Sequence, residues 1–392
     1  MPQLIISTVG TSLLTNQINP KLHPNNWQDR LNKSANYTVE EMESDPDVKD
    51  ILEILKKRVE DKLYNEDTEE DKIREISAEL NGIYGIYEYT EKSQQDQHWL
   101  ITTDTAQGKI AANLVQSFLK LKFKGMDVQV YTPNNLSTKS TDKFQDGIDN
   151  FLKWADETLP GYKNNGYYKI RFNLVGGFKA LQGYLNTIGM FYADEIIYIF
   201  EGNSELVKIP RLPIELKKSV IRPVQFALMA TEVGIWVKRS ELEGVEPAET
   251  LLFIVDDEAT LTSWGRLTWN NCKRDFLTAE KLLEFPKIKY EKSFEKDYQK
   301  NATDANKKLY LHEVIAEVSA SMIKYNGDTT RFDRRLNFSR YEGKKKCEGG
   351  ISKNQIDHFY IKNTGRRVSC ILDKGQLYLR HYGEHDYVND NP

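Results

Sequence analysis

Short apolar runs alternate with helical patterns along the first two hundred residues of the chain. The runs that predict buried strands are LIISTV (4–9), WLITT (99–103), VQVYT (128–132), IRFNLV (170–175) and EIIYIF (195–200). Between them, apolar residues at helical spacing predict helices over 105–122, 141–158 and 178–192. This alternation is typical of an α/β Rossmann-like fold, in which helices cover both faces of a mostly parallel sheet.

An acidic helical segment, residues 28–96, follows the first predicted strand. Runs such as DILEILKKRVEDKL place apolar residues at helical spacing among charged ones. This pattern predicts surface helices with a solvated face rather than a metal or substrate site. We therefore interpret 28–96 as an insertion into the parallel-sheet domain.

The patterns change after IPRLP (209–213), which reads as a linker and ends the first predicted domain at residue 213. Residues 214–285 combine a helical run, VIRPVQFALMATEVGI, with a possible hairpin, and predict a small winged-helix-like connector. Residues 286–392 begin with a strand and a helix in KIKYEKSFEKDYQ, and a second helix is predicted over 309–325. Four alternating runs, RLNFSRY, HFYIKN, RRVSCILD and QLYLRHYG, then predict an α+β domain with an antiparallel sheet.

Composition narrows the class of protein. No apolar run approaches the roughly 18 residues of a membrane span, and MPQLIISTVGTS lacks the features of a signal peptide, so we expect a cytoplasmic protein without a membrane partner. Cys272, Cys347 and Cys370 are far apart and form no CxxC pair. Their spacing argues against both a zinc site and a disulfide framework, and no metal site is predicted.

The net charge of −4 hides an asymmetry, because residues 286–392 carry +6 and residues 1–285 carry −10. Aromatic residues alternate with bases in RFDRRLNFSRYEGKKK (331–346), a mixture that suits RNA because cations neutralise phosphates and rings stack on bases. A strand with a solvated basic face is the alternative. The predicted RNA-binding residues are Arg331, Arg334, Arg335, Arg340, Lys344, Lys345 and Lys346.

Three strand ends in the first domain have the composition of ligand-binding loops: VGTSLLTN (9–16), TTDTAQGK (102–109) and NLVGGFKALQ (173–182). Glycines allow a ligand to approach the backbone, and helix N-termini there supply free N–H groups for a phosphate or a sugar edge. No P-loop and no GxGxxG is present, which disfavours a Rossmann dehydrogenase. The predicted ligand-binding residues are Gly10, Thr11, Ser12, Asn16, Thr103, Asp104, Thr105, Lys109, Gly176, Gly177, Phe178 and Lys179.

The last predicted strand, LYLRHYGEHDYV (377–388), carries His381 and His385. Cleavage of RNA without a metal needs a base for the 2′-hydroxyl, a cation for the phosphorane and an acid for the leaving oxygen. Histidine and arginine suit these roles. Strand alternation predicts Arg380 and Tyr382 on one face and His381 on the other. His385 is the favoured catalytic histidine, while His381 is expected to pack.

The segments ISTVGTSLLTN, NLVGGFKALQGYLNTIGMFYADEIIYIFEG (173–202) and IPRLP resemble the CARF domain, the CRISPR-associated Rossmann fold. The resemblance covers residues 1–213 apart from the insertion. It implies a homodimer in which two copies of the Gly10–Asn16 and Gly176–Lys179 loops surround one cyclic oligoadenylate. Cyclic tetra-adenylate is the expected activator, although members of the family differ in ring size and in whether they cleave the ring.

The segments IKYEKSFEKDYQ, NTGRRVSCIL and LYLRHYGEHDYV resemble RelE-type mRNA interferases over residues 286–392. The resemblance implies a ribosome-dependent endoribonuclease that cuts mRNA and needs no cofactor. By position, Arg367 looks like the transition-state arginine and Lys362 like a base near the phosphate. His385 looks like the acid/base group, with Tyr387 nearby for stacking or proton handling, and Arg366 and Arg380 are further catalytic candidates. Tyr360 stands where some relatives carry a second lysine, which leaves the general base open.

The sequence therefore predicts a type III CRISPR effector with a CARF sensor (1–213), a connector (214–285) and a RelE-like ribonuclease (286–392). The alternative is a ligand-responsive transcription regulator whose connector binds DNA. Positive charge gathers in residues 331–385 rather than in 214–285, which favours the ribonuclease.

Overall fold

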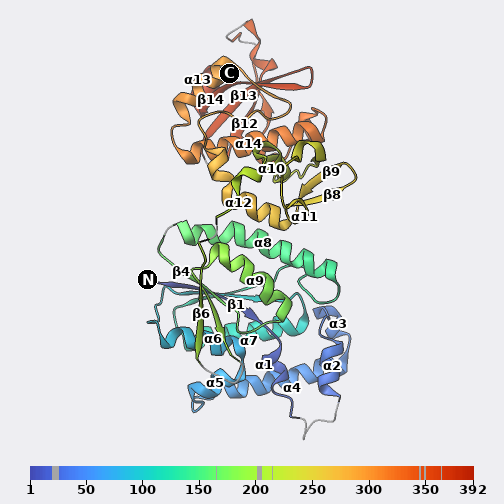
Figure 1. Cartoon of the computed structure of the whole chain (residues 1–392), viewed down its shortest axis with the longest axis vertical. Helices are drawn as coiled ribbons and strands as arrows, with labels where there is room; N and C mark the ends of the chain where they lie inside the picture. The colour runs from blue at the N-terminus through green and yellow to red at the C-terminus, as the bar shows by residue number, and fades with distance from the viewer. Residues whose placement is uncertain are drawn as a thin grey trace. The chain divides into compact units, whose positions relative to one another are not determined.

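The protein is described from a computed structural model of residues 1–392. The described residues are 1–19, 26–164, 166–200, 205–213, 215–343, 346–347, 350–362 and 364–392. They form two compact units, Met1–Ile214 and Glu215–Pro392 (Figure 1). Each unit has its own hydrophobic core.

The first unit is built on a sheet to which six described strands contribute, in the order β3-β2-β1-β4-β5-β6. Strands β1 to β5 run parallel and β6 is antiparallel to β5. The central strand β1 is buried at every position, as expected for a strand with helices on both faces. The predicted mostly parallel α/β sheet is confirmed. The strands are β1 (Gln3–Val9), β2 (Gln97–Thr102), β3 (Asp127–Tyr131), β4 (Lys169–Asn173), β5 (Glu195–Ile199) and β6 (Leu206–Pro210).

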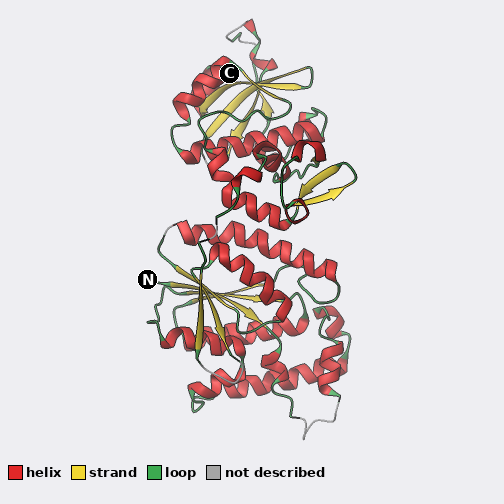
Figure 2. Ribbon diagram, in the orientation of Figure 1, coloured by secondary structure: helices red, strands yellow, loops and turns green. Residues whose placement is uncertain are grey.

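Helices cover both faces of this sheet (Figure 2). Helices α8 and α9 lie on one face, and α6 and α7 lie on the other. The predicted break at IPRLP falls partly within β6, because Ile209 and Pro210 still pair with β5 and the proline stands at the strand's last position. The helices are α7 (Ala106–Lys122), α8 (Thr141–Asn164) and α9 (Lys179–Tyr192).

The insertion after β1 contains one long amphipathic helix, α4. Asp45 caps its N-terminus by accepting a hydrogen bond from the N–H of Val48, and Pro46 occupies the first turn, where its missing N–H costs nothing. Its buried residues, at helical spacing, pack against α1 and α7. The helices of this region are α1 (Ser12–Thr15), α2 (Trp27–Lys33), α3 (Val39–Glu43), α4 (Pro46–Leu63), α5 (Glu70–Ile76) and α6 (Ala78–Glu88).

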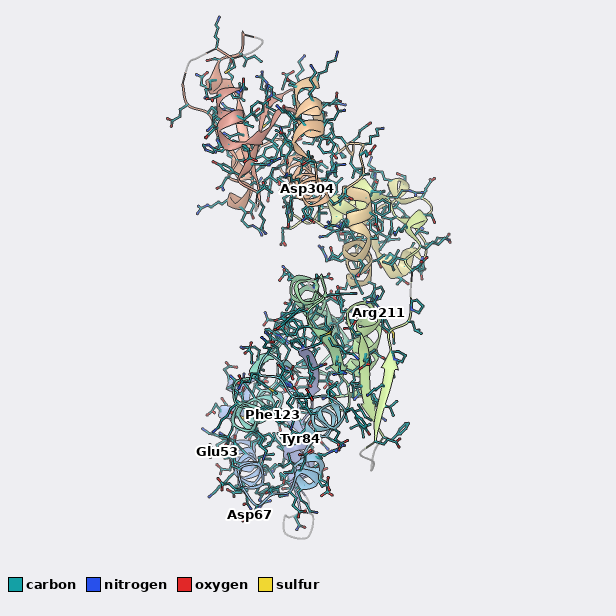
Figure 3. The ribbon with its side chains drawn as sticks, turned by 90° about the vertical axis from the view of Figure 1, so that its left-hand side faces the viewer. Glu53, Asp67, Tyr84, Phe123, Arg211 and Asp304 are labelled. Atoms are coloured by element: carbon teal, nitrogen blue, oxygen red, sulfur yellow. The ribbon has the colours of Figure 1, made fainter. Side chains whose placement is uncertain are left out.

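Helix α6 differs from the solvated surface helices that the sequence predicts for the insertion. It is buried along most of its length and lies directly on the sheet. Its Tyr84 ring packs beside Phe123, which follows α7, with ring centroids 5.8 Å apart (Figure 3). The interpretation of 28–96 as solvated helices is therefore wrong for α6, whose sequence around Tyr84 is nearly uncharged and belongs to the core.

The second unit ends in a sheet to which five described strands contribute, in the order β10-β14-β13-β12-β11. Strand β10 is parallel to β14, and the other neighbours are antiparallel. Helices α13 and α14 pack on it, and the short helix α15 lies against β13 and β14. The elements are β10 (Ile288–Tyr290), α13 (Lys292–Asn301), α14 (Ala305–Lys324), β11 (Ser339–Arg340), β12 (Asp357–Ile361), β13 (Arg366–Asp373), β14 (Gln376–Glu384) and α15 (His385–Asp390).

The run RLNFSRY, predicted as a full strand, forms one only at its end. Arg334–Leu336 make a turn of 3-10 helix, and Asn337 then adopts a left-handed conformation with φ 45°. That conformation interrupts an extended strand, so only Ser339 and Arg340 pair with β12.

Residues 215–285 share one hydrophobic core with the C-terminal sheet, in which Phe226 and Trp269 are buried. Residues 215–285 also contribute a small sheet in the order β7-β9-β8. The helix just before the β8–β9 hairpin, α11, has four residues, and the longer α12 follows the hairpin. The winged-helix-like connector stays a prediction, because β7 pairs with the hairpin while α11 is shorter than a typical recognition helix. The elements are α10 (Pro223–Met229), β7 (Val237–Lys238), α11 (Ala248–Leu251), β8 (Leu252–Val255), β9 (Glu258–Leu261) and α12 (Ser263–Leu277).

A search of the described residues finds no helix with both the length and the apolar character needed to cross a bilayer.

Candidate functional site

The glycine loops of the first unit meet where the strand order reverses. Strand β1 lies between β2 and β4, so the crossovers diverge at the β1–β4 junction, the usual ligand position in an open α/β sheet. Gly10 follows β1 and Gly177 follows β4. A Cβ added to Gly10 would lie 3.1 Å from the Gly177 nitrogen, and Gly177 has φ +89°. Two predicted ligand loops are therefore in contact, and the left-handed backbone at Gly177 favours glycine there.

A buried carboxylate that the sequence reasoning missed joins these loops. Glu79, in the first turn of α6, is fully buried, and its Oε1 accepts a hydrogen bond from the Gly10 N–H at 2.6 Å. Its Oε2 accepts one from the Ser77 hydroxyl at 2.7 Å. Burial raises the pKa of Glu79, although the N–H groups of Gly10 and Gly177 and the Ser77 hydroxyl oppose this. The signal was available, because Glu79 is the only charged residue in ISAELNGIYGIY (76–87).

The second predicted loop is largely satisfied by its own hydrogen bonds. Thr105 caps α7 by accepting from the Gly108 N–H at 3.2 Å, and its hydroxyl lies 2.9 Å from that of Thr103. Asp104 forms an ion pair with Lys109 at 2.7 Å and accepts from the Asn135 N–H at 3.1 Å. Burial raises the pKa of Asp104, but the bonds from Lys109 and from the Asn135 N–H lower it further, so the pKa lies below its usual value. Lys109 is thus paired, which weakens its attraction for a ligand phosphate.

The remaining predicted residues of the first loop lie on helix α1. Thr11 stands at its N-cap without a side-chain cap, and Ser12 begins it. Asn16 ends it and lines a cavity with Gln17, Lys62 and residues of the insertion. Asn16 therefore lies one turn beyond the Gly10–Gly177 contact and faces a different surface.

The third loop leads into α9. The Phe178 ring packs edge-on against Phe144 with centroids 5.7 Å apart, so Phe178 holds the loop against α8. Lys179 is exposed at the first residue of α9 and forms no ion pair with any described residue. Lys179 is therefore the predicted cation best placed to meet a phosphate beside the glycine loops.

The sheet of the second unit has one apolar and one polar face. Phe359, Val368 and Tyr382 are fully buried on the side of α13 and α14. Strand pairing places two rows of side chains on the opposite face. The first row is His358, Ser369 and His381, and the second is Tyr360, Arg367 and Gly383.

Arg367 is the centre of the polar face. Its guanidinium donates to the Tyr360 hydroxyl and to the Asn389 side chain on α15, and it lies 4.4 Å from the Tyr360 ring centroid. Arg367 is only 3% exposed, yet its Nε has no partner among the described residues. A buried N–H without an acceptor is costly, and an incoming phosphate oxygen would satisfy it.

His358 stands beside Arg367 and was missed from the sequence. Its ring stacks on Tyr341 with centroids 4.2 Å apart, and its Nδ1 is buried without a partner among the described residues. Burial, with a contribution from Arg367, lowers the pKa of His358 to about 4. His358 is therefore neutral at physiological pH. The alternation in HFYI, which puts His358 and Tyr360 on one face, was the signal that could have found it.

Helix α15 carries two of the predicted catalytic residues across this face. His385 begins the helix with its side chain 51% exposed, and its Nδ1 lies 2.7 Å from Asp386. Tyr387 donates from its hydroxyl to Asp297 Oδ1 at 2.8 Å. Val388 is fully buried and anchors the helix. His385 thus stands at the solvent-facing rim of the polar face.

Three other predicted catalytic residues have different surroundings. Arg366 projects toward the opposite face, where it donates to the Asn301 carbonyl at 2.6 Å and pairs with Glu384. Lys362 follows β12 and is exposed. Arg380 lies 3.7 Å from Glu291.

Simple alternation along β14 is wrong at Arg380. The register passes from Ser369↔His381 to Cys370↔Leu379, so Arg380 is the extra residue of a β-bulge. The bulge shifts the phase of the strand, which explains why Leu379 and Tyr382 are both buried. Arg380 and Tyr382 therefore do not form the common face that the sequence predicts.

The predicted RNA-binding bases are scattered. Arg335 pairs with Asp333, and Arg340 pairs with Asp357, each at 2.8 Å. Arg331 lies over the Tyr325 ring at 4.7 Å. Arg334 and Lys346 are exposed, whereas Lys344 and Lys345 lie outside the described residues.

The aromatic residues between these bases face the protein rather than solvent. Phe332 and Tyr341 are each 8% exposed, and Phe338 stacks on the buried Phe359 with centroids 6.1 Å apart. The expectation that Phe332, Phe338 and Tyr341 form a platform for bases is therefore wrong. They fill the core and support His358.

Comparison with known families places part of the chain. Residues 74–212 match the family described as CRISPR-associated protein (Cas_APE2256). The match begins in α5 and runs through β6, so it includes both Glu79 and the Gly176–Gly177 loop. No curated protein matches the chain. The family match supports a CRISPR-related role for this protein.

Proposed function

We propose that the protein is a type III CRISPR effector that cuts ribosome-bound mRNA without a metal ion and is activated by a cyclic oligoadenylate. The observation that carries the proposal is the polar face of the second unit. There Arg367 is buried, its Nε–H has no acceptor among the described residues, and it lies beside Tyr360 on the same face as His358 and His381. Such a face suits phosphoryl chemistry because its cation and histidines supply charge stabilisation and proton transfer.

Arg367 would stabilise the negative charge that builds on the phosphorane. A phosphate oxygen could bind Nε and take the place of the Asn389 side chain on the guanidinium. His385, at the rim, would protonate the leaving 5′-oxygen, because a protonated imidazole can act as a general acid. The products would be a 2′,3′-cyclic phosphate and a 5′-hydroxyl.

The first unit would act as the sensor. The Gly10 and Gly177 loops meet at the switch point of the sheet, and Lys179, which begins the next helix, forms no ion pair within the part of the chain that the structure describes. The resemblance to CARF domains implies that a second copy of the chain completes this site as a homodimer. A ligand such as cyclic tetra-adenylate would activate the enzyme by binding its active conformation more tightly than its inactive one.

Ribosomes carrying mRNA are the natural target of a basic C-terminal region, because counterion release favours its binding to phosphates. The +6 charge of residues 286–392 supports this choice of partner.

The test incubates the purified full chain with translating ribosomes, mRNA and cyclic tetra-adenylate in the magnesium buffer that intact ribosomes need, and identifies the ends of the RNA fragments. We expect cleavage that requires the cyclic nucleotide. Arg367→Ala should lower the cleavage rate by roughly 100-fold or more while leaving binding of the cyclic nucleotide intact. Lys281→Ala, at a side chain 88% exposed in the same unit, is the surface control and should cut normally. Fragments with 3′-hydroxyl and 5′-phosphate ends, or equal rates for Arg367→Ala and the unmodified chain, would overturn the proposal.

A further inference from the structure

His381, expected from the sequence to pack, is held by a buried carboxylate. Its Nδ1 lies 2.9 Å from Asp297 Oδ2, and Asp297, on α13, is only 6% exposed. The same carboxylate accepts from the Tyr382 backbone N–H at 3.1 Å and from the Tyr387 hydroxyl at 2.8 Å. These donors come from β14 and α15, so they fix the carboxylate against the edge of the sheet.

This contact sets the tautomer of the neutral imidazole. An ionised carboxylate only accepts hydrogen bonds, so Nδ1 carries the proton that lies toward Asp297. In the neutral ring the lone pair is then on Nε2, which is free to take a proton. No described residue forms a hydrogen bond with Nε2 of His381. Nε2 is also not one of the fully buried polar atoms that lack a partner among the described residues, so it keeps some contact with solvent. His381 therefore has the arrangement of an oriented base.

The position of His381 suits a role beside Arg367. His381 pairs with Ser369, and Arg367 pairs with Gly383, so the two side chains are diagonal neighbours on one face. Diagonal positions on paired strands are about 7–8 Å apart at the backbone, and both long side chains can reach a group between them. The Ser369 hydroxyl also accepts from the His381 N–H at 3.2 Å and fixes the strand there.

The other histidines of this face lack such support. His385 pairs with Asp386, whose side chain is 95% exposed, so solvent competes for that contact. His358 stacks on Tyr341 and has no carboxylate bonded to its ring among the described residues. His381 is thus the histidine of this face whose orientation a buried acid controls.

We propose that His381 is the general base of the ribonuclease and that Asp297 is its positioning residue. The inference rests on the proposed ribonuclease function and deepens it. Nε2 of His381 removes the proton of the 2′-hydroxyl, and the 2′-oxygen attacks the phosphorus. The bond between phosphorus and the 5′-oxygen breaks, and this oxygen takes a proton from protonated His385. One proton is thus gained at His381 and one is lost at His385.

The test measures single-turnover cleavage by full-length variants. His381→Ala should cut roughly 100-fold to 10,000-fold more slowly than the unmodified chain, and added imidazole should restore part of its rate. Asp297→Asn should also be slow and should change the pH dependence of the rate, because the amide no longer holds the same tautomer. Rescue by imidazole keeps the test sharp, since a merely unfolded variant would not respond to it.

A substrate whose leaving 5′-oxygen is replaced by sulfur separates base from acid, because a thiolate leaves without protonation. It should restore cleavage by His385→Ala but not by His381→Ala. Restoration in His381→Ala, or a normal rate for that variant on ordinary RNA, would overturn the assignment of His381. If the unmodified chain cuts no RNA, the proposed function itself fails. If the unmodified chain cuts RNA and Arg367→Ala does not, the proposed function holds, and the results for His381→Ala test only the assignment of His381 as the general base.

Discussion

Substituting Gly176 by alanine tests the buried junction of the glycine loops. A Cβ at this position would fall on the Glu79 side chain, 2.6 Å from Cγ. Both residues are buried, so the carboxylate must move to make room. Gly176 is not in a left-handed conformation, and alanine therefore meets a steric conflict without a backbone penalty.

The magnitude follows from what Glu79 loses. Overpacking of a buried site costs about 1–3 kcal/mol, and a hydrogen bond to a charged group contributes about 1.5–3 kcal/mol. We expect Gly176→Ala to lower the free energy of unfolding by about 3 kcal/mol. For a unit of this size, that corresponds to a melting temperature lower by roughly 6–12 °C.

Gly183→Ala is the matched control. Gly183 is exposed within α9, and an added Cβ would meet nothing within 4 Å. Alanine stabilises an exposed helix interior by about 0.5–1 kcal/mol relative to glycine, so this variant should be slightly more stable than the unmodified chain. Urea unfolding of the full chain is followed by tryptophan fluorescence, to which Trp99 and Trp154 contribute from the first unit and Trp264 and Trp269 from the second, and the transition that the variant shifts is compared between the two chains.

The double variant with Glu79→Ala separates steric conflict from other effects. Without the Glu79 side chain, Gly176→Ala should cost little more than Glu79→Ala alone. The reasoning is refuted if Gly176→Ala is as stable as Gly183→Ala, or if its cost is unchanged when Glu79 is removed.

Three further outcomes are expected. Burial lowers the pKa of His98 to about 4, below its unfolded value near 6.5, so the first unit should lose about 3 kcal/mol of stability as the pH falls from 6.5 to 4; His98→Gln should flatten this slope in acid unfolding curves, and an unchanged slope would contradict it. Arg366→Ala removes the bonds to Asn301 and Glu384 and should lower the free energy of unfolding in urea by about 2 kcal/mol. Arg367→Lys should instead slow cleavage while changing the free energy of unfolding little. If Arg366→Ala slowed cleavage and Arg367→Lys destabilised the fold, the two arginines would be assigned to the wrong faces of the sheet. Lys179→Ala should weaken binding of cyclic tetra-adenylate by roughly 10-fold in calorimetry, and undiminished affinity would remove Lys179 from the site.

Periodicity predicted the first unit well because its strands are buried on both faces. Continuous apolar runs such as LIISTV are typical of strands in a parallel sheet that helices cover on both faces. The helix over 105–122 was likewise found almost to the residue, because Thr105 supplies its cap. Local patterns were sufficient where local and tertiary preferences agree.

Residues that depend on distant partners escaped the sequence reasoning. Glu79 lies 69 positions from Gly10, so its role is invisible in its own helical pattern. The β-bulge at Arg380 shifts the alternation of side chains along β14, and the local sequence gives no sign of the bulge. His381 was judged a packing residue because Asp297 is 84 positions away. Long-range pairing, rather than composition, determined which polar side chains meet.

The ends of the RNA fragments test the central claim most directly. Ribosome-bound mRNA is incubated with the full chain and cyclic tetra-adenylate, and the new termini are identified chemically. A site built from Arg367, His381 and His385 predicts 2′,3′-cyclic phosphate and 5′-hydroxyl ends, lost in Arg367→Ala. Termini with 3′-hydroxyl and 5′-phosphate groups, or no new termini at all, would contradict the account.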